Sequence, residues 1–329
     1  MTRPALGRAT LEDVARAAGV SRSTASRVLA GYGPTSAAAR DRVTAAAARL
    51  GYAPDLAARA LASGAGVRLA VAVAGTSADV LRDPYVDRVL RSTAELCTQH
   101  GLGVSLHWLP HNAPAQLRRL AEDRGVRGVL IVNTTELILE AVPEALRKRT
   151  VSIGIGSPTV PSIDVDNAGG ALSILAHLHD SGRRRIAMIT GPEWLPCVQR
   201  PVRAYTELMR AAQLPVRAVP GDFTTAGGRT AMLEVLRRWP DTDAVFASND
   251  AMALGALAVL RQRGIDVPGD IAVAGFDDIP FASLSVPALT TASHPVEQIA
   301  AAAASAVLDR AGVPPVTTYP SELILRESA

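Results

Sequence analysis

Residues 10–29 constrain the fold of this chain more than any other segment, because helix caps, a turn glycine and small apolar residues occur there together. Thr10 followed by Asp13 three residues later is the pattern of a capping box, and Ser21 can cap a second helix. Gly19 stands between the two, where a sharp turn requires a positive φ that glycine adopts at little cost. The segment therefore predicts two short helices joined by a tight turn.

The side chains of this predicted helix pair separate into an inner and an outer set. Small or branched apolar residues would let the helices cross closely: Val14, Ala15, Ala18, Val20, Ala25 and Val28. The outer side of the second helix carries guanidiniums and hydroxyls, which suit base edges and phosphates: Arg22, Ser23, Ser26 and Arg27. We expect a helix-turn-helix that binds the major groove. The alternative, an αα-hairpin in an all-helical packing unit, is disfavoured because the cap, glycine and small-residue positions all agree.

The positive charge of the chain belongs to its N-terminal piece. The 329 residues have a formal net charge of +3. Residues 1–62 hold nine arginines against four acidic residues, a net charge of +5, which leaves −2 for the rest. This distribution is expected when only the N-terminal piece contacts phosphate.

Several classes of site lack their usual signals. Cys97 and Cys197 cannot define a disulfide framework and no Cys/His cluster has zinc spacing, so we expect structural thiols, no metal and no cofactor. The sequence has no Gly-x-Gly-x-x-Gly, no Walker loop and no Gly-x-Ser-x-Gly elbow, so none of these motifs indicates an enzyme. Without a leader sequence or an unbroken apolar run of about 18 residues, we expect a cytoplasmic protein that does not contact membranes.

Helix caps and helix-breaking residues along the chain indicate three parts. A third helix should run from a cap near Ser36 to Leu50 and end at Gly51. Residues 55–62 form a helical piece too short to hold a helix in isolation. The predicted parts are a helix-turn-helix domain, 1–54, a hinge helix and linker, 55–66, and a core, 67–329.

From residue 67 onward, short apolar strands alternate with amphipathic helices, which predicts parallel, doubly wound sheets. Two such halves suggest two α/β subdomains, roughly 67–165 and 166–293, with the segment 294–329 crossing between them. Ligands usually bind in such a cleft, at the carboxyl ends of strands. The expected strands are 68–74, 104–107, 128–132, 151–155, 162–165, 186–190, 244–248 and 271–275, and the expected helices are 85–100, 115–124, 170–180, 203–212 and 252–263.

Polar residues follow two strands of the second half. Ser248-Asn249-Asp250 ends one strand and Gly275-Phe-Asp277-Asp278 ends the next. Carboxylates and amides at such positions can accept hydrogen bonds from ligand hydroxyls or ring nitrogens. We expect Asp277 to contact a ligand, because an acid directly after a buried strand has little structural need. Asp250 would either contact the ligand or cap the next helix.

Over essentially its whole length the chain resembles the LacI/GalR family of bacterial transcription repressors. The motifs are Thr10-Leu-Glu-Asp-Val-Ala-x3-Gly-Val-Ser21-x-Ser-Thr-x-Ser-Arg27-Val-Leu, Leu50-Gly-Tyr-x-Pro54, Val165-Asp-Asn-x-Gly169, Asn249-Asp-x-Met-Ala-Leu-Gly255 and Gly275-Phe-Asp-Asp278. The resemblance implies an N-terminal all-α helix-turn-helix domain and an α/β core, similar to periplasmic sugar-binding proteins, of two doubly wound parallel-sheet subdomains. It also implies a homodimer, or dimer of dimers, that binds double-stranded operator DNA and a small-molecule effector.

By the same resemblance, DNA contacts fall on the helix-turn-helix and on the hinge leucine Leu61, which would wedge into the minor groove. Ordinary helix packing is the alternative role for Leu61. The full set is Thr10, Ser21, Arg22, Ser23, Thr24, Ser26, Arg27 and Leu61.

The candidate effector-binding residues are Tyr85, Asn133, Arg200, Phe223, Asn249 and Asp277. The family usually has an arginine four residues before the aromatic residue at Tyr205. Pro201 stands there instead, so the adjacent Arg200 either replaces that arginine or does not bind the effector. Stacking on a sugar would fall on Tyr85, Trp194 or Phe223.

The sequence thus favours a repressor whose operator affinity is modulated by a sugar or nucleoside. One alternative is a solute-binding protein, which the absent export signal and the N-terminal 62 residues disfavour. The other is a nucleotide-dependent α/β enzyme that carries a DNA-binding domain, which a nucleotide bound to the purified protein would support. The sequence does not identify the effector.

Overall fold

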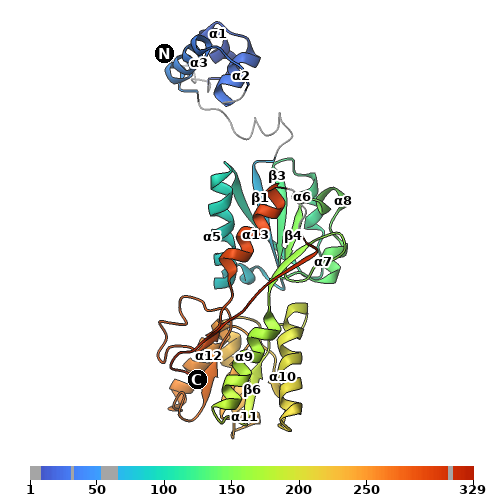
Figure 1. Ribbon diagram of the computed structural model, residues 1–329, viewed down its shortest axis with the longest axis vertical. Coiled ribbons are helices and arrows are strands. Elements are labelled where there is room, and N and C mark those ends of the chain that lie inside the picture. The colour runs from blue at the N-terminus through green and yellow to red at the C-terminus, as the bar shows by residue number, and fades with distance from the viewer. Residues whose placement is uncertain (1–8, 31–32, 53–65, 310–313) are drawn as a thin grey trace, which may run out of the picture. The chain divides into compact units, whose positions relative to one another are not determined.

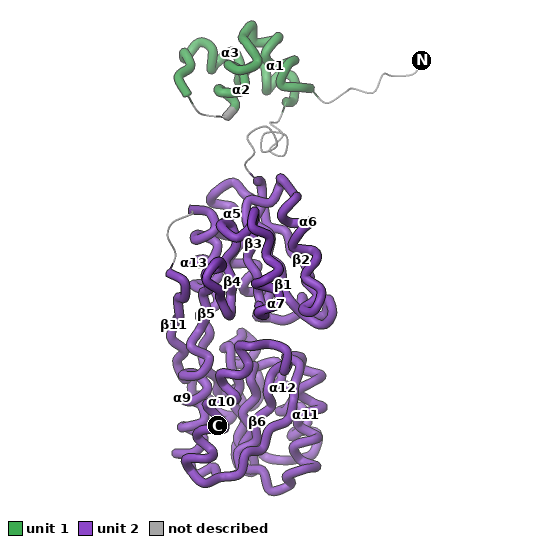
Figure 2. Tube along the Cα trace, turned by 90° about the vertical axis from the view of Figure 1, so that its right-hand side faces the viewer, with its two compact units in different colours: residues 1–65 green, residues 66–329 purple. Residues whose placement is uncertain are grey.

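The computed structural model describes residues 9–30, 33–52, 66–309 and 314–329. The chain divides into two compact units, Met1–Ala65 and Gly66–Ala329, which Figure 2 shows in different colours. The predicted hinge residues 55–62, including Leu61, lie outside the described residues.

The described residues of the first unit form three helices, α1 (Leu11–Ala18), α2 (Arg22–Ala30) and α3 (Ala37–Leu50). Thr10 and Asp13 form the predicted capping box, and Gly19 ends α1 with a φ of 62°. Ser36 caps α3 and Gly51 ends it, as the sequence predicts. The core that holds the helices together is made of valines and alanines: Val14, Ala15, Ala18, Ala25, Val43, Ala46 and Ala47.

The first subdomain of the second unit is built on a six-stranded parallel sheet of order β11-β5-β4-β3-β1-β2. Its strands are β1 (Arg68–Gly75), β2 (Gly103–Pro110), β3 (Val126–Val132), β4 (Thr150–Ile153), β5 (Ser162–Val165) and β11 (Val316–Tyr319). Figure 1 shows α5 (Pro84–Gln99) and α13 (Val296–Asp309) side by side against this sheet. The other face packs on α6 (Gln116–Glu122), α7 (Glu136–Glu140) and α8 (Glu144–Arg147).

Side chains of β1 alternate between these two faces, because successive residues of a strand point in opposite directions. Leu69, Val71 and Val73 pack in the cluster that includes α5 and α13. The smaller alanines between them belong to the cluster on the opposite face. The strand is therefore buried on both sides, as a strand inside a parallel sheet must be.

The second subdomain has a four-stranded parallel sheet of order β7-β6-β8-β9. Its strands are β6 (Ile186–Ile189), β7 (Arg217–Val219), β8 (Ala244–Ala247) and β9 (Ala272–Ala274). Helices α9 (Asn167–Asp180) and α10 (Gln199–Ala211) cover one face, and α11 (Thr225–Arg238) and α12 (Asp250–Arg263) cover the other. Helices on both faces of two parallel sheets confirm the predicted doubly wound core.

The chain passes between the subdomains after β5, again between β10 (Thr291–Ala292) and α13, and again between β11 and β12 (Leu323–Ile324). β10 and β12 form an antiparallel pair that contacts α9. The C-terminal segment therefore contributes α13 and β11 to one subdomain and β12 to the other.

Helix α9 begins earlier than the sequence analysis placed it, because a polar cap lies further upstream. Asp166 accepts a hydrogen bond from the Gly169 N–H at 2.9 Å, so α9 begins at Asn167 and not at residue 170. Among the described residues, no helix is long and apolar enough to cross a membrane.

Candidate functional site

The predicted DNA-reading residues of the first unit gather at the start of α2. Ser21, Arg22 and Ser23 are exposed, while Thr24, Ser26 and Arg27 are partly buried. The Ser21 hydroxyl lies 2.9 Å from Ser23 Oγ and 2.8 Å from Thr24 Oγ1, and it accepts the Thr24 N–H. These contacts fix the first turn of the helix.

Two of the predicted DNA-binding residues, Arg22 and Thr10, differ in whether their side chains are already hydrogen-bonded within the protein. Among the described residues, no hydrogen bond or ion pair engages the Arg22 side chain, so its guanidinium is free to meet a base or a phosphate. The Thr10 hydroxyl, in contrast, donates to Asp13 at 2.7 Å within the capping box, and this bond lowers the pKa of Asp13. Thr10 therefore has a structural role at the start of α1, beside its predicted role at DNA.

The second unit contains a pocket of about 600 Å³, its open mouth included, at the strand ends of both sheets. Asn133 and Thr134 follow β3, and Gly154 follows β4 in the first subdomain. Phe223 follows β7, and Asn249 follows β8 in the second. This is where α/β sheets bind ligands, because the loops at carboxyl ends of parallel strands converge there.

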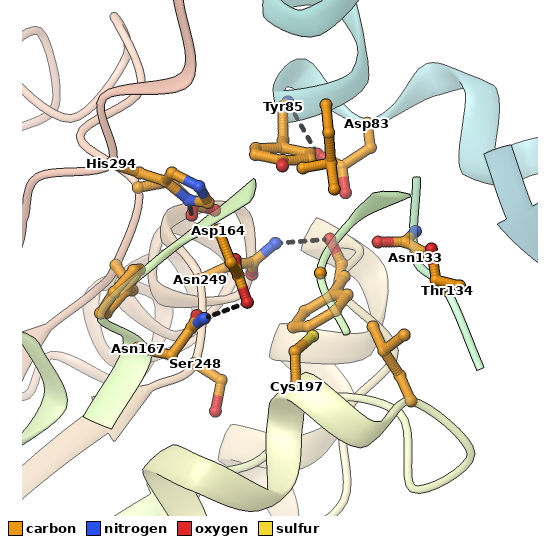
Figure 3. A pocket seen from close by; sticks show the side chains of 16 residues that line it. Asp83, Tyr85, Asn133, Thr134, Asp164, Asn167, Cys197, Ser248, Asn249 and His294 are labelled. Carbon is orange, nitrogen blue, oxygen red and sulfur yellow. Dashed lines mark hydrogen bonds and ion pairs between the residues drawn. The ribbon is translucent and has the colours of Figure 1, made fainter. Parts of the chain in front are cut away.

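Five of the six predicted effector-binding residues line this pocket: Tyr85, Asn133, Phe223, Asn249 and Asp277. Figure 3 shows Tyr85 and Asp83 above the space, His294 on one side, and Asn133 with Thr134 on the other. Tyr85 and Phe223 also supply two of the rings proposed for stacking.

Arg200 and Trp194 are placed differently from the expectation. Arg200 does not line the pocket; its Nη1 donates to Asp164 Oδ2 at 2.8 Å, so it acts on a lining carboxylate from outside. This ion pair joins α10 to β5, across the two subdomains. The Trp194 ring packs on the His111 ring at a centroid distance of 4.7 Å, which takes it out of the stacking set.

Asp277 is held by its neighbours at the end of β9. Its Oδ1 lies 2.9 Å from His294 Nδ1. The Arg88 guanidinium on α5 donates to the Asp277 carbonyl at 2.8 Å and to the His294 carbonyl at 3.1 Å. The Asp277 carboxyl thus lines the pocket beside His294, and its contact with a ligand stays a prediction, whereas the bridge to the first subdomain is made by the Asp277 main chain.

Burial controls the charges in the pocket, because a charged form loses hydration there. It raises the pKa of Asp277 to about 8 against the opposing effect of Arg88, and it lowers the pKa of His294 to about 4. Burial, reinforced by the nearby Asp277, raises the pKa of Asp83 to about 7. Burial in the pocket thus disfavours charge on both residues of the Asp277–His294 pair.

Asp250 takes neither of its two predicted roles. Asn249 is the N-cap of α12, since its Oδ1 accepts the Met252 N–H at 2.9 Å. Asp250 does not line the pocket; it is fully buried and accepts the Ile279 N–H at 2.9 Å and the Thr291 hydroxyl at 2.6 Å. Its carboxylate ties the start of α12 to β10 and the loop after β9.

Backbone strain concentrates at this site. Among the described residues, five other than glycine have positive φ, and three of them line the pocket: Asn133 at 60°, Phe223 at 67° and Asp277 at 106°. Asp278, next to Asp277, has a φ of 47°. Such conformations persist where the surroundings over-determine them, and they cluster at ligand sites.

Sequence reasoning missed several lining residues. Asp83 caps α5 by accepting the Tyr85 N–H at 2.9 Å, and its Asp-Pro pair before a helix was the available signal. Asp164 is a buried acid inside an apolar strand, immediately before a motif that the sequence analysis used. His294 lies 17 residues after Asp277, where the chain crosses between the subdomains, and no motif of the sequence analysis includes it.

Comparisons with known proteins agree with this architecture. Residues 10–55 match the family described as bacterial regulatory proteins, lacI family, and residues 175–329 match a periplasmic binding protein-like domain. The HTH-type transcriptional regulator CelR of Thermobifida fusca is 33% identical over 332 residues, covering 97% of this chain and 96% of CelR.

Two solved structures extend the comparison. A transcriptional regulator CelR–cellobiose complex has a TM-score of 0.71 and 31% identity, covering 98% of this chain and 100% of that one. A lac repressor dimer bound to operator and the anti-inducer ONPF has a TM-score of 0.85 and 25% identity, covering 98% and 99%.

A helix-turn-helix unit followed by a two-subdomain core with a pocket at its strand ends defines the class of ligand-modulated DNA-binding regulators. The chain belongs to the LacI family of bacterial transcriptional regulators. The named relatives are transcriptional regulators as well.

Proposed function

We propose that this regulator is a homodimeric repressor whose operator affinity changes when a sugar-sized effector binds the pocket of the core. The observation that carries the proposal is that the lining residues come from the strand ends of both subdomains. A ligand that contacts both sides binds one arrangement of the subdomains better than others, and only such differential binding can shift a conformational equilibrium. CelR, with cellobiose bound in its solved structure, supports a sugar-type effector.

The DNA side of the proposal rests on α2. Its first turn presents Ser21, Arg22 and Ser23 to solvent, and the chemistry of these side chains suits base edges and phosphates. We assign operator reading to residues 1–54 and the hinge to residues 55–66, where Leu61 remains a prediction outside the described residues. Binding to operator DNA requires a protein in the cytoplasm, where we place it. Modulation by a bound effector requires no chemical reaction in the pocket.

The homodimer is supported by one exposed loop of the second unit. Between β9 and β10, Phe281 is 58% exposed, Leu284 is 75% exposed and Val286 is 81% exposed. Apolar side chains gathered on one loop favour contact with another protein surface. A second copy is the partner that the lac repressor dimer suggests, and it would bring two helix-turn-helix units to the two halves of a palindrome.

The proposal is tested by a thermal-shift screen of neutral sugars, amino sugars and nucleosides on the full chain, followed by operator titrations with each compound that stabilises it. A ligand of the native state must raise the melting temperature. Tyr85→Phe removes one hydroxyl from the pocket while keeping the ring that packs on His294 at 4.8 Å. Compounds that stabilise the protein but never change operator affinity would contradict the proposal.

A further inference from the structure

The charges that line the pocket are unbalanced. Three carboxyl groups, Asp83, Asp164 and Asp277, line it, and no lysine or arginine does so among the described residues. Asp164 is paired with Arg200 at 2.8 Å. The remaining two acids have no side-chain cation bonded to them within the described part of the chain.

Arg88 interacts with Asp277, but its guanidinium is engaged by other groups. Arg88 donates to both oxygens of Glu297 at 2.8 Å and to the carbonyls of Asp277 and His294. Its guanidinium therefore faces main-chain oxygens and a carboxylate behind the pocket, and leaves the Asp277 carboxyl without a direct ion pair.

Three acceptors on interacting residues of the pocket lack a donor, since Asp277 contacts His294 and lies near enough to Asp83 to raise the pKa of that acid. Asp83 accepts the Tyr85 N–H through Oδ1, and Asp277 contacts His294 through Oδ1, so each Oδ2 has no donor among the described residues. His294 is only 7% exposed, and its Nε2 is buried without a hydrogen-bond partner. When Asp277 is ionised and accepts the Nδ1–H, a neutral His294 presents Nε2 as an acceptor.

We propose that the effector of this regulator carries a protonated amine, which Asp83 and Asp277 hold on the His294 side of the pocket. This inference rests on the proposed function and adds the chemical class of the ligand. An ammonium group has three N–H donors, no acceptor and one positive charge, whereas a hydroxyl brings one donor and no charge. The ring of Tyr85, which lies between Asp83 and His294 in Figure 3, offers a surface that attracts cations.

Two further observations favour an organic cation. Burial raises the pKa of both Asp83 and Asp277, and each carboxylate costs free energy while it has no counter-ion. Among the described residues, no group of three or more His, Cys, Asp or Glu side chains could hold a metal ion. A cation that brings its own hydrogen-bond donors is the ligand that relieves both the charge and the unpaired acceptors.

The experiment is a calorimetric titration of the full-length protein with matched ligands at one pH near neutrality. The probes are D-glucosamine with D-glucose and N-acetyl-D-glucosamine, and D-galactosamine with D-galactose and N-acetyl-D-galactosamine. We expect an amine to bind at least about tenfold more tightly than its neutral partners, because charge-assisted hydrogen bonds are stronger than neutral ones. A neutral sugar that binds as tightly as its amine overturns the inference, and so does a complete absence of amine binding.

Variants then locate the amine. Asp277→Asn and Asp83→Asn should each remove most of the preference for the amine while affinity for the neutral partner changes little. Asp87→Asn on α5 is the matched control, because this acid is 63% exposed and is paired with Arg91 outside the pocket. An amine preference that survives in both pocket variants contradicts the assignment. Failure of the proposed function is distinguishable, since it would appear as unchanged operator affinity with any ligand bound.

Discussion

Arg88 on α5 and Glu297 on α13 form a bidentate ion pair. Arg88 Nε donates to Glu297 Oε1 and Arg88 Nη2 donates to Oε2, both at 2.8 Å. The same guanidinium donates to the carbonyls of Asp277 and His294. One side chain of the first subdomain therefore supports the pocket wall of the second. The hydrogen bonds to Arg88 also lower the pKa of Glu297, which keeps this acid ionised.

Arg88→Met should loosen this wall. The side chain of Arg88 is 15% exposed, so its loss removes a donor from the Asp277 carbonyl in a largely buried place, while the His294 carbonyl keeps the Val296 N–H at 2.7 Å. We expect the second unit to lose about 1–3 kcal/mol of stability and ligand affinity to fall, as measured by thermal unfolding and calorimetry. Arg91→Met, in a 67% exposed pair, is the control. Ligand affinity equal to wild type in Arg88→Met would show that the bridge does not position the pocket.

Stability should fall as pH rises from about 5 to 8, in a way that depends on Asp277. The folded state keeps Asp277 protonated up to a pKa of about 8, whereas the unfolded chain ionises it near its ordinary value of 3.8. Between these values the folded state holds the extra proton, so raising the pH favours unfolding by up to about 1.4 kcal/mol per pH unit. Asp277→Asn should flatten this slope relative to wild type in denaturant unfolding, whereas Asp87→Asn should keep it. Equal slopes in all three proteins would refute the assigned pKa.

Arg22 should determine preference at one base pair of each operator half-site. A guanidinium that binds a guanine bidentately contributes roughly 1–3 kcal/mol of discrimination. Arg22→Ala should therefore reduce the ratio of cognate to scrambled affinity in fluorescence anisotropy. Arg237→Ala removes the same charge from α11, where the side chain is 70% exposed, and should leave the ratio unchanged. If the ratio survives in Arg22→Ala, this arginine contacts phosphate or nothing.

The exposed loop between β9 and β10 should hold the dimer together. Leu284→Glu places a charge on a side chain that is 75% exposed in the single chain, so it should weaken dimerisation without unfolding the core. Sedimentation velocity should show the variant shifted toward monomer at concentrations where wild type is dimeric. Leu137→Glu, on α7 and 49% exposed, is the control that should stay dimeric. A dimeric Leu284→Glu would place the interface elsewhere.

The sequence predicted those parts of the fold that local chemistry determines. The capping box of Thr10 and Asp13 and the left-handed Gly19 depend on neighbours a few residues away, so their pattern is legible in the chain. The parallel sheets follow from the alternation of apolar strands with helices. The placement of Asn249 and Asp277 in one pocket follows from the rule that carboxyl ends of parallel strands meet.

The remaining features depend on contacts between distant segments. His294 reaches the pocket because the chain returns from β10 to α13, and its partner Asp277 lies 17 residues earlier. Arg200 has its partner Asp164 36 residues away in the other subdomain, so its sequence position next to Pro201 could not show which way it points. Asp250 could not be separated from Asn249 as a cap without knowing that Ile279 and Thr291 bind its carboxylate.

The central claim is that the pocket and the operator are coupled, and reciprocity tests it most directly. Operator affinity is measured by anisotropy with and without the effector found by screening, and effector affinity by calorimetry with and without operator, for wild type and Asp277→Asn. The account predicts the same coupling factor in both directions, of about 5 to 150-fold as is common for allosteric proteins. In Asp277→Asn, operator binding without effector should stay at the wild-type level while the effector response is lost. Wild-type effector affinity and an undiminished response in Asp277→Asn would contradict the account.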